Sequence, residues 1–500
     1  MTRTARIPKV ILTLYIFTVF TLIPLAMPTG YKNLGEMKCS LFLKAASVFT
    51  PLFLILLIGA FISGRTRLKD YRTLLTLTVI FAANLLLSSA LSADFQKSLS
   101  GSPGWRMGLF AFLAMLVSAL AAAVFNPPGG YIYLPLLAGA AASSIIAAAN
   151  RFGLDLMMPH LSAENRQDFI GTLGNINWFA GFLAVTIPIA ISLLFSDNKK
   201  MRTAGSITLF ILLTAAVLQG SNGLLPALCA VCIVLFVLAA ADSAYQRPFL
   251  TMLLILGAAM EACTAAVLLF PGAYNGPADN LFLRVAGFHI GLFIVGAAVL
   301  CLHFQKKRQF DNLPRAAKLL LPTVLTLAVL LPLLLLVIQL TVILPRNFGT
   351  YRGFIWHVAK AGFRKLPFLN MLFGVGPDLM GDYLVSVPGF QDLISAVYGN
   401  AKLLNAHSML LTQLLNTGIL GVSSHLILVT FALRKGLTAL GAYKKEGNPE
   451  PTWLLASLLG VISYEIYMMF SFDQVTVTPL FYILLGALYS ENPSRTTVGS

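Results

Sequence analysis

The chain has 500 residues, of which 57% are hydrophobic and only 11% are charged, and its mean hydropathy is +0.82. An average soluble domain carries about 25% charged residues, so this composition excludes a soluble globular protein. The net charge of +16 comes from short tufts of Lys and Arg between apolar runs. Such tufts are membrane topology signals, whereas a nucleic-acid binder gathers its cations on one face. We therefore expect an all-α, polytopic membrane protein that binds a lipid bilayer and no nucleic acid.

Apolar runs of about 17–25 residues, long enough to cross a bilayer as a helix, follow one another along the chain. The predicted spans are 7–27, 41–64, 73–93, 107–125, 131–150, 174–195, 203–218, 224–241, 249–270, 281–302, 319–344, 408–433, 451–470 and 475–490. The first is long enough to be a span rather than a signal peptide, and the last is short. The sequence thus predicts a bundle of about 12–14 membrane helices that forms one integral membrane domain over residues 1–500.

The loops between these spans predict the topology. With the N-terminus inside, short inner segments such as 65–72, 199–202, 306–318 and 434–445 hold most of the 35 Lys and Arg residues. The positive-inside rule then places both termini in the cytoplasm. The outer segments 94–106, 151–173 and 345–407 are longer than a helix hairpin needs. Only 345–407 is large enough for a small extracytoplasmic subdomain, and long segments of this kind are usually functional.

Several residues inside the spans or in this loop have two interpretations each. Residues 351–366 have the pattern of an amphipathic helix, which could lie on the membrane with its cations toward lipid phosphates. Glu261 and Glu465 lie within spans, where an ionisable residue is a site hypothesis by default, but we favour protonated helix-packing residues. Cys229 and Cys232 form a C-x-x-C in an apolar run, where helix packing is favoured over a redox or zinc site.

Three segments on the predicted outer side carry recognisable motifs. They are GTLGNINWFAGFLAV (171–185), RGFIW with FGVGPD downstream (352–356 and 373–378), and AHSMLLTQLLNTGILG (406–421). In this order they resemble the G-N-x-N-x-x-A-G, Arg-x-x-x-Trp with F-G-x-G-P, and A-H-N-x-x-L…E-T-G-x-x-G segments of the O-antigen ligase and polymerase-like family of bacterial membrane proteins. The resemblance covers about residues 171–433 as a ligase-like core.

This resemblance implies a fold related to the GT-C glycosyltransferases and an activity on the extracytoplasmic face of the bacterial inner membrane. Family members transfer or polymerise a glycan from an undecaprenyl-diphosphate carrier onto an acceptor glycan or glycolipid, with no metal and no cofactor. By resemblance, His407 activates the acceptor hydroxyl and Arg352 holds the diphosphate. Trp356 and the motif residues Asn175 and Asn177 then belong to the substrate site.

The chain departs from the family where an S-R-G segment is usual, since it has Ser221-Asn222-Gly223. An asparagine donates hydrogen bonds but brings no charge to a diphosphate. Ser221 and Asn222 are still expected at the substrate site. Either an outer arginine such as Arg166, Arg346 or Arg106 supplies the charge, or the donor differs, or activity is lost.

The chemistry of the outer residues agrees with this resemblance. A departing diphosphate needs its charge neutralised by a metal or by arginines. The large loop offers only Asp378 and Asp382 as an acidic pair at helical spacing, whereas arginines bind phosphate oxygens bidentately. A metal-free site with a neutral histidine as base is therefore favoured. The alternatives are a transporter or flippase, or an inactive relative that acts as a scaffold.

Overall fold

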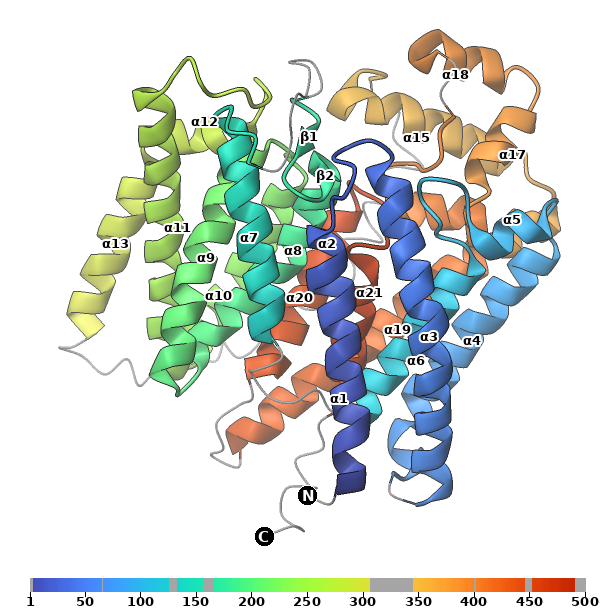
Figure 1. The fold of residues 1–500 in the computed structure, drawn as a ribbon, viewed down its shortest axis with the longest axis horizontal. Helices are drawn as coiled ribbons and strands as arrows, with labels where there is room; N and C mark the ends of the chain where they lie inside the picture. Colours follow the sequence, from blue (N-terminus) through green and yellow to red (C-terminus); the bar gives the residue numbers. More distant parts are fainter. Residues whose placement is uncertain are drawn as a thin grey trace.

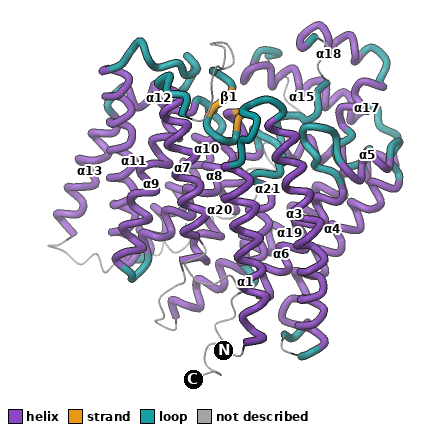
Figure 2. The backbone as a smooth tube through the Cα atoms, in the orientation of Figure 1, coloured by secondary structure: helices purple, strands orange, loops and turns teal. Residues whose placement is uncertain are grey.

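The protein is a helical bundle whose described residues include one two-stranded hairpin (Figures 1 and 2). The computed structural model describes residues 3–64, 66–125, 133–156, 166–305, 345–399, 402–445 and 452–490. Within these ranges, nine helices are long and apolar enough to cross a membrane, or ten if one bent pair counts as a single span. The expected all-α, multi-pass architecture is therefore confirmed.

The N-terminal part supplies the helices up to α7. Their bounds are α1 Arg3–Phe17, α2 Ile23–Leu25, α3 Leu34–Ile62, α4 Arg72–Ala90, α5 Phe95–Ser100, α6 Leu109–Phe125 and α7 Tyr133–Arg151. A π-helix (Thr18–Leu22) joins α1 to α2, and a 3-10 turn (Leu68–Tyr71) precedes α4. The fully buried Lys38 donates from Nζ to the carbonyls of Ile23 (2.7 Å), Pro24 (2.8 Å) and Ala26 (3.0 Å). It thereby satisfies carbonyls that a helix end leaves without partners.

The middle of the chain contains the hairpin and the central helix. Its elements are β1 Phe169–Ile170, β2 Gly174–Asn175, α8 Ile176–Ser192, α9 Lys199–Gln219, α10 Leu224–Ala241, α11 Ser243–Leu269, α12 Leu281–Gly287 and α13 Ile290–Gln305, with a 3-10 turn (Leu193–Phe195) after α8. The strands β1 and β2 are antiparallel, with Phe169 opposite Asn175. Nearly all of α8 is buried, so this helix is the core of the bundle.

The C-terminal part adds short helices and then the last long ones. They are α15 Phe348–Arg364, α16 Phe368–Phe373, α17 Met380–Ser386, α18 Phe390–Tyr398, α19 Met409–Lys445, α20 Thr452–Met468 and α21 Thr478–Ala487. In Figure 1, α15, α17 and α18 lie at the end of the bundle opposite the start of α1, together with α5, α12 and β1. All three sequence motifs therefore lead to this end.

The apolar face of α15 packs on the protein. Phe354, Ile355, Val358 and Ala359 are buried, and the helix contacts α17 and α19. The predicted amphipathic helix is therefore present, and its apolar face packs on protein.

The helices follow the predicted spans with three differences. The span predicted for 281–302 is bent by 67° between α12 and α13. The helix α19 extends to Lys445 and breaks at Gly418, whose φ is 70°. The helix at 478–487 is shorter than a full crossing needs, and the helices at 109–125 and 452–468 are at the lower limit of that length. The span predicted for 319–344 lies outside the described residues, so the total of about 12–14 spans stays a prediction.

Large apolar side chains cover the outside of the bundle. Ile55, Ile62, Leu269 and Phe293 are 67%, 83%, 72% and 76% exposed. Exposed apolar side chains of this kind are those that lipid solvates, in keeping with a multi-pass membrane protein.

Glu261 has a specific structural role at the bend of α12 and α13. Its Oε2 lies 2.8 Å from Nδ1 of His289, the residue at the bend, and its Oε1 accepts the N–H of Leu292 (3.1 Å). Leu292 is in the first turn of α13, where amide groups lack intrahelical partners and the helix dipole favours a negative charge. Glu261 thus packs α11 on α13 by capping the second half of a broken helix.

Candidate functional site

Hydrogen bonds hold the backbone around His407, while Nδ1 of its imidazole makes none within the described ranges. The N–H of His407 donates to Oδ1 of Asn405 (3.1 Å), and the N–H of Ala406 donates to Oγ1 of Thr412 (2.9 Å). The ring packs edge-on against Phe472, with centroids 5.1 Å apart. Its Nδ1 is buried and has no hydrogen-bond partner among the described residues. His407 also has a φ of 47°, an uncommon conformation for a residue with a side chain.

Arg352 is held in a similar way at the start of regular helix in α15. The three residues before it, Gly349, Thr350 and Tyr351, all have positive φ. Its Nη1 donates to the carbonyl of Gly349 (3.1 Å), and its Nε is buried without a partner in the described part of the chain. Burial lowers the pKa of this guanidinium, but an arginine stays charged near neutral pH. Strained backbone of this kind gathers at functional sites.

Trp356 joins these two residues. It lies one helical turn after Arg352 on the same face of α15, and its Nε1 donates to the carbonyl of Ala406 (3.0 Å), the residue before His407. Burial and, secondarily, the positive charge of Arg352 lower the pKa of His407 to about 4. The structure therefore brings Arg352 and His407 into one electrostatically coupled site, where the histidine is neutral at physiological pH.

Tyr467 connects this pair to the Gly171–Val185 motif. The charge of Arg352 acts on Tyr467, whose hydroxyl donates to the carbonyl of Asn177 (2.6 Å). Oγ of Ser221 donates to Oδ1 of the same asparagine (2.9 Å). Asn175 caps α8 by accepting the N–H of Asn177 (2.8 Å). Residues from three motif regions thus converge through Tyr467, which sequence reasoning missed because it looks like one more aromatic residue in an apolar run.

Asn222 points away from this convergence. Its Nδ2 donates to the carbonyl of Asp279 (2.9 Å), and its Oδ1 accepts the N–H of Leu281 (2.8 Å), the first residue of α12. It therefore organises the start of α12, a role that an arginine side chain would not fill.

Two of the three arginines that could supply the charge absent at Asn222 already form ion pairs with carboxylates. Arg166 forms a bidentate pair with Asp155 (2.6 and 3.1 Å), and Arg106 forms one with Glu36 (2.7 Å to Oε1 and 3.3 Å to Oε2). Arg346 is exposed, its guanidinium has no partner among the described residues, and its carbonyl accepts the N–H of Phe354 in α15 (3.1 Å). Of these three, Arg346 is thus the one whose guanidinium forms no ion pair with a described residue. It also bonds through its carbonyl to the helix that carries Arg352.

Arg151, at the end of α7, was missed by sequence reasoning and positions the 166–175 segment. It is 1% exposed, and among the described residues the hydrogen-bond partners of its guanidinium are backbone carbonyls. It donates to the carbonyls of Arg166 (2.6 Å), Gln167 (3.3 Å), Leu218 (3.2 Å) and Gln219. The last two are at the C-terminus of α9, where the helix dipole favours a cation.

Glycines explain why the second and third motifs occur together. An added Cβ on Gly374 of FGVGPD would collide with the backbone of Asn416 and Thr417, and one on Gly418 would collide with Leu372 and Gly374. Both glycines have positive φ, which favours a residue without a Cβ. The N–H groups of Val375 and Gly376 donate to the carbonyls of Leu415 and Asn416 (both 2.9 Å). The two motifs therefore pair backbone to backbone.

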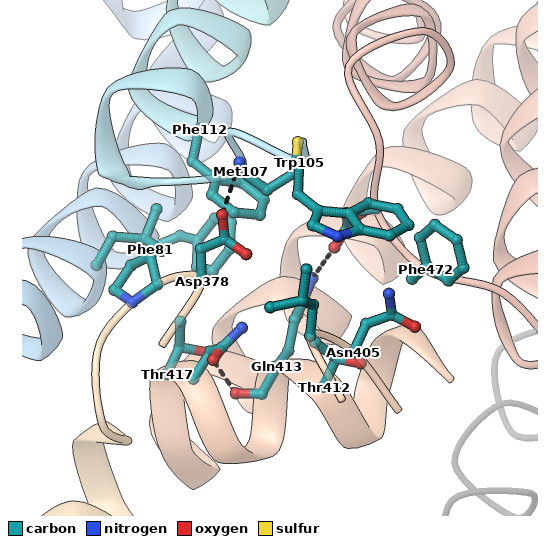
Figure 3. A pocket seen from close by; sticks show the side chains of 15 residues that line it. Phe81, Trp105, Met107, Phe112, Asp378, Asn405, Thr412, Gln413, Thr417 and Phe472 are labelled. Atoms are coloured by element: carbon teal, nitrogen blue, oxygen red, sulfur yellow. Dashed lines mark hydrogen bonds between the residues drawn. The ribbon is translucent and has the colours of Figure 1, made fainter. Parts of the chain in front are cut away.

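A cavity of about 30 Å³ lies beside this pairing (Figure 3). It is lined by polar residues, including Asp378, Asn405, Gln413, Asn416 and Asp473, and by aromatic residues, including Trp105, Phe112 and Phe472. Phe472 and Asn405 also contact His407, so the cavity adjoins the candidate site. Its volume is enough for one or two water molecules.

Asp378, the last residue of the FGVGPD motif, binds the loop before α6 through hydrogen bonds. Its Oδ2 accepts the N–H groups of Ser102 (2.6 Å) and Met107 (3.2 Å), the second of which is drawn in Figure 3. Burial raises its pKa to about 7, although these two donors favour the carboxylate and act the other way. Asp382 is instead paired with Lys97 and Lys402, so the acidic pair is split between two environments. No group of three or more His, Cys, Asp or Glu residues that could hold a metal occurs in the described ranges.

No model of a known protein family matches the chain, and no curated protein matches it in sequence.

Proposed function

We propose that the protein is a membrane glycosyltransferase of the O-antigen ligase or polymerase type, with a GT-C-like core. It would move a glycan from an undecaprenyl-diphosphate carrier to an acceptor glycan or glycolipid on the extracytoplasmic face of the bacterial inner membrane. The observation that carries this proposal is the coupled pair of Arg352 and His407. Each has a buried nitrogen without a partner in the described ranges, and the cation and the neutral imidazole suit the two charges that the reaction creates.

The proposed reaction uses each residue once. The bond between the donor sugar and the diphosphate breaks, and a bond between that sugar carbon and the acceptor hydroxyl oxygen forms. Arg352 binds the diphosphate oxygens and stabilises the negative charge of the leaving group. His407 accepts the hydroxyl proton and later releases it to water. The carrier leaves as undecaprenyl diphosphate.

The charge of Arg352 links the strength of this base to donor binding. Without donor, burial and secondarily that charge lower the pKa of His407 to about 4, so the imidazole is a weak base. A diphosphate bound at Arg352 brings negative charge beside the histidine, which stabilises the imidazolium and raises its pKa. The base is therefore strongest when a donor is in place, which disfavours activation of an acceptor without one.

The test is transfer from purified undecaprenyl-diphosphate glycan by the full chain in nanodiscs. His407→Ala and Arg352→Ala should each lower the rate by at least about 100-fold. Arg352→Lys should restore only part of it, because an ammonium lacks the planar fork. His357→Ala and Arg364→Ala are matched controls, since both side chains are exposed on the same helix and should leave the rate unchanged. Normal transfer by both His407→Ala and Arg352→Ala would refute the assignment.

A transporter or flippase is the second candidate, and the bent pair of α12 and α13 favours it, because broken helices are common in transporters. Deleting the protein distinguishes the two. A lipid-linked glycan that accumulates on the outer leaflet supports transfer, whereas one stranded on the inner leaflet supports transport. Full insertion with no transfer of any donor and no stranded glycan would indicate the scaffold alternative.

A further inference from the structure

Ionisable side chains meet inside the bundle, beyond the Arg352–His407 site. Nε2 of His425 in α19 lies 3.0 Å from Oε1 of Glu465 in α20, and the two side chains are 1% and 4% exposed. Asp473, in the connection between α20 and α21, lies close enough for the charges of both to act on it. Its carboxylate accepts hydrogen bonds from Tyr464 (2.7 Å) and Gln413 (3.1 Å). The proposed transfer reaction uses none of these groups.

The network leaves several polar atoms without partners. Nδ1 of His425, Oε2 of Glu465 and Oε1 of Gln413 are buried and have no hydrogen-bond partner in the described part of the protein. Each such atom costs about 1–3 kcal/mol if it stays unpaired. Asp473 and Gln413 also line the cavity beside Asp378, which has room for water. Water and exchangeable protons are the partners that a site of this size accepts.

The charges of the network require bound protons. With every group deprotonated, Glu465 and Asp473 carry two negative charges in an apolar interior, where an uncompensated charge is costly. Among the described residues, no lysine or arginine bonds to either carboxyl. The neighbouring helices α6 and α8 contain no ionisable residue, α4 contributes Asn84, and α21 contributes Tyr482. Neutrality is thus reached only when two protons are shared among Glu465, His425 and Asp473.

We propose that Glu465, His425 and Asp473 form an interior proton-binding site, which exchanges protons with the outer face through the cavity lined by Gln413 and Asp378. Intramembrane acids paired with a histidine are the chemistry of proton relays. Of the three, Asp473 is the one that lines the cavity, which has room for water. The charges of His425 and Glu465, which lie deeper in the bundle, act on Asp473. The ligand is the proton itself, and the proposal does not depend on glycosyl transfer.

Infrared spectroscopy of the full chain in nanodiscs tests this proposal, because a protonated carboxyl gives a C=O band that shifts in D₂O. Spectra of the parent and of Glu465→Gln, Asp473→Asn and His425→Gln are recorded from about pH 5 to about pH 9. Parent-minus-variant differences cancel the contribution of Asp378. We expect a protonated-carboxyl band at pH 7 that Glu465→Gln or Asp473→Asn removes. His425→Gln should move its titration midpoint by about one pH unit or more.

Glu261→Gln is the matched control, since this intramembrane carboxyl pairs with the half-exposed His289 and lies outside the network. It should leave the band unchanged. Gln413→Leu, which fills the cavity wall with an apolar group, should slow the D₂O shift of the band. A parent-minus-variant difference at pH 7 that shows no such band for either Glu465→Gln or Asp473→Asn would overturn the proposal. A band displaced by Na⁺ at constant pH would also overturn it, in favour of a cation site.

Discussion

Asp378→Asn should change how the stability of the protein depends on pH. Burial raises the pKa of Asp378 to about 7 in the folded protein, from an ordinary value of 3.8. The folded state therefore holds this proton more tightly than the unfolded state does. Stability from this group is fully present below about pH 4 and falls as the pH rises toward 7, because the unfolded chain can then release the proton while the folded chain keeps it.

The size of the effect follows from the two pKa values. They differ by about three units, and each unit is worth about 1.36 kcal/mol. Above pH 7 the buried carboxylate should therefore cost about 4 kcal/mol relative to pH 4, as an upper bound, because the cavity lets water approach it. An asparagine does not titrate, and its Oδ1 can still accept the N–H groups of Ser102 and Met107 that the carboxylate binds.

The assay is the apparent unfolding temperature of the full chain in nanodiscs between about pH 4.5 and pH 8. Asp378→Asn should be at least as stable as the parent at pH 8 and should lose the parent's decline between these limits. Asp382→Asn is the control with the opposite sign. Burial raises the pKa of Asp382, but Lys97 and Lys402 outweigh it and lower the net value, so that substitution should cost stability at neutral pH. An unchanged decline in Asp378→Asn would refute the reasoning.

Three further substitutions test the geometry of the candidate site. Trp356→Phe removes the hydrogen bond to Ala406 and should cost about 0.5–1.5 kcal/mol of stability and lower the transfer rate; unchanged melting and transfer would show that this bond does not position His407. Arg352→Gln removes the cation that depresses His407, so the histidine pKa, measured by NMR on labelled protein, should rise; a constant value would mean that the two side chains are not coupled. Gly374→Ala puts a Cβ against the backbone of Asn416 at a positive φ and should cost at least about 1–3 kcal/mol, seen as a lower unfolding temperature, whereas Gly389→Ala, with open space around its Cβ, is the milder control at a similarly positive φ.

Of the seven non-glycine residues with positive φ in the described ranges, four lie in or next to the motifs. His407, Asp378 and Tyr351, the neighbour of Arg352, all have positive φ, although each carries a side chain that disfavours it. Such conformations persist only where surrounding contacts hold them. The bonds from Trp356 to Ala406 and from Ser102 to Asp378 are contacts of that kind.

The sequence by itself determined the class and the layout of the helices. Apolar runs of spanning length occur because a lipid-embedded backbone must satisfy its own hydrogen bonds, so the helix at 224–241 agrees residue for residue with its predicted span. The resemblance to a ligase family, and the roles of His407 and Arg352 within it, stay predictions that the transfer assay addresses.

Only the tertiary structure decided which polar groups pair. Asp155 engages Arg166, Asn222 turns to α12, and Glu465 meets His425 from a helix 40 residues away in sequence. Periodicity reports which face of a helix is apolar, but it holds no information on which residue of another helix lies opposite a given side chain. In a low-dielectric interior, a charge that is paired is neutralised, whereas an unpaired charge destabilises the folded state. The chemistry of this bundle is therefore set by contacts between helices.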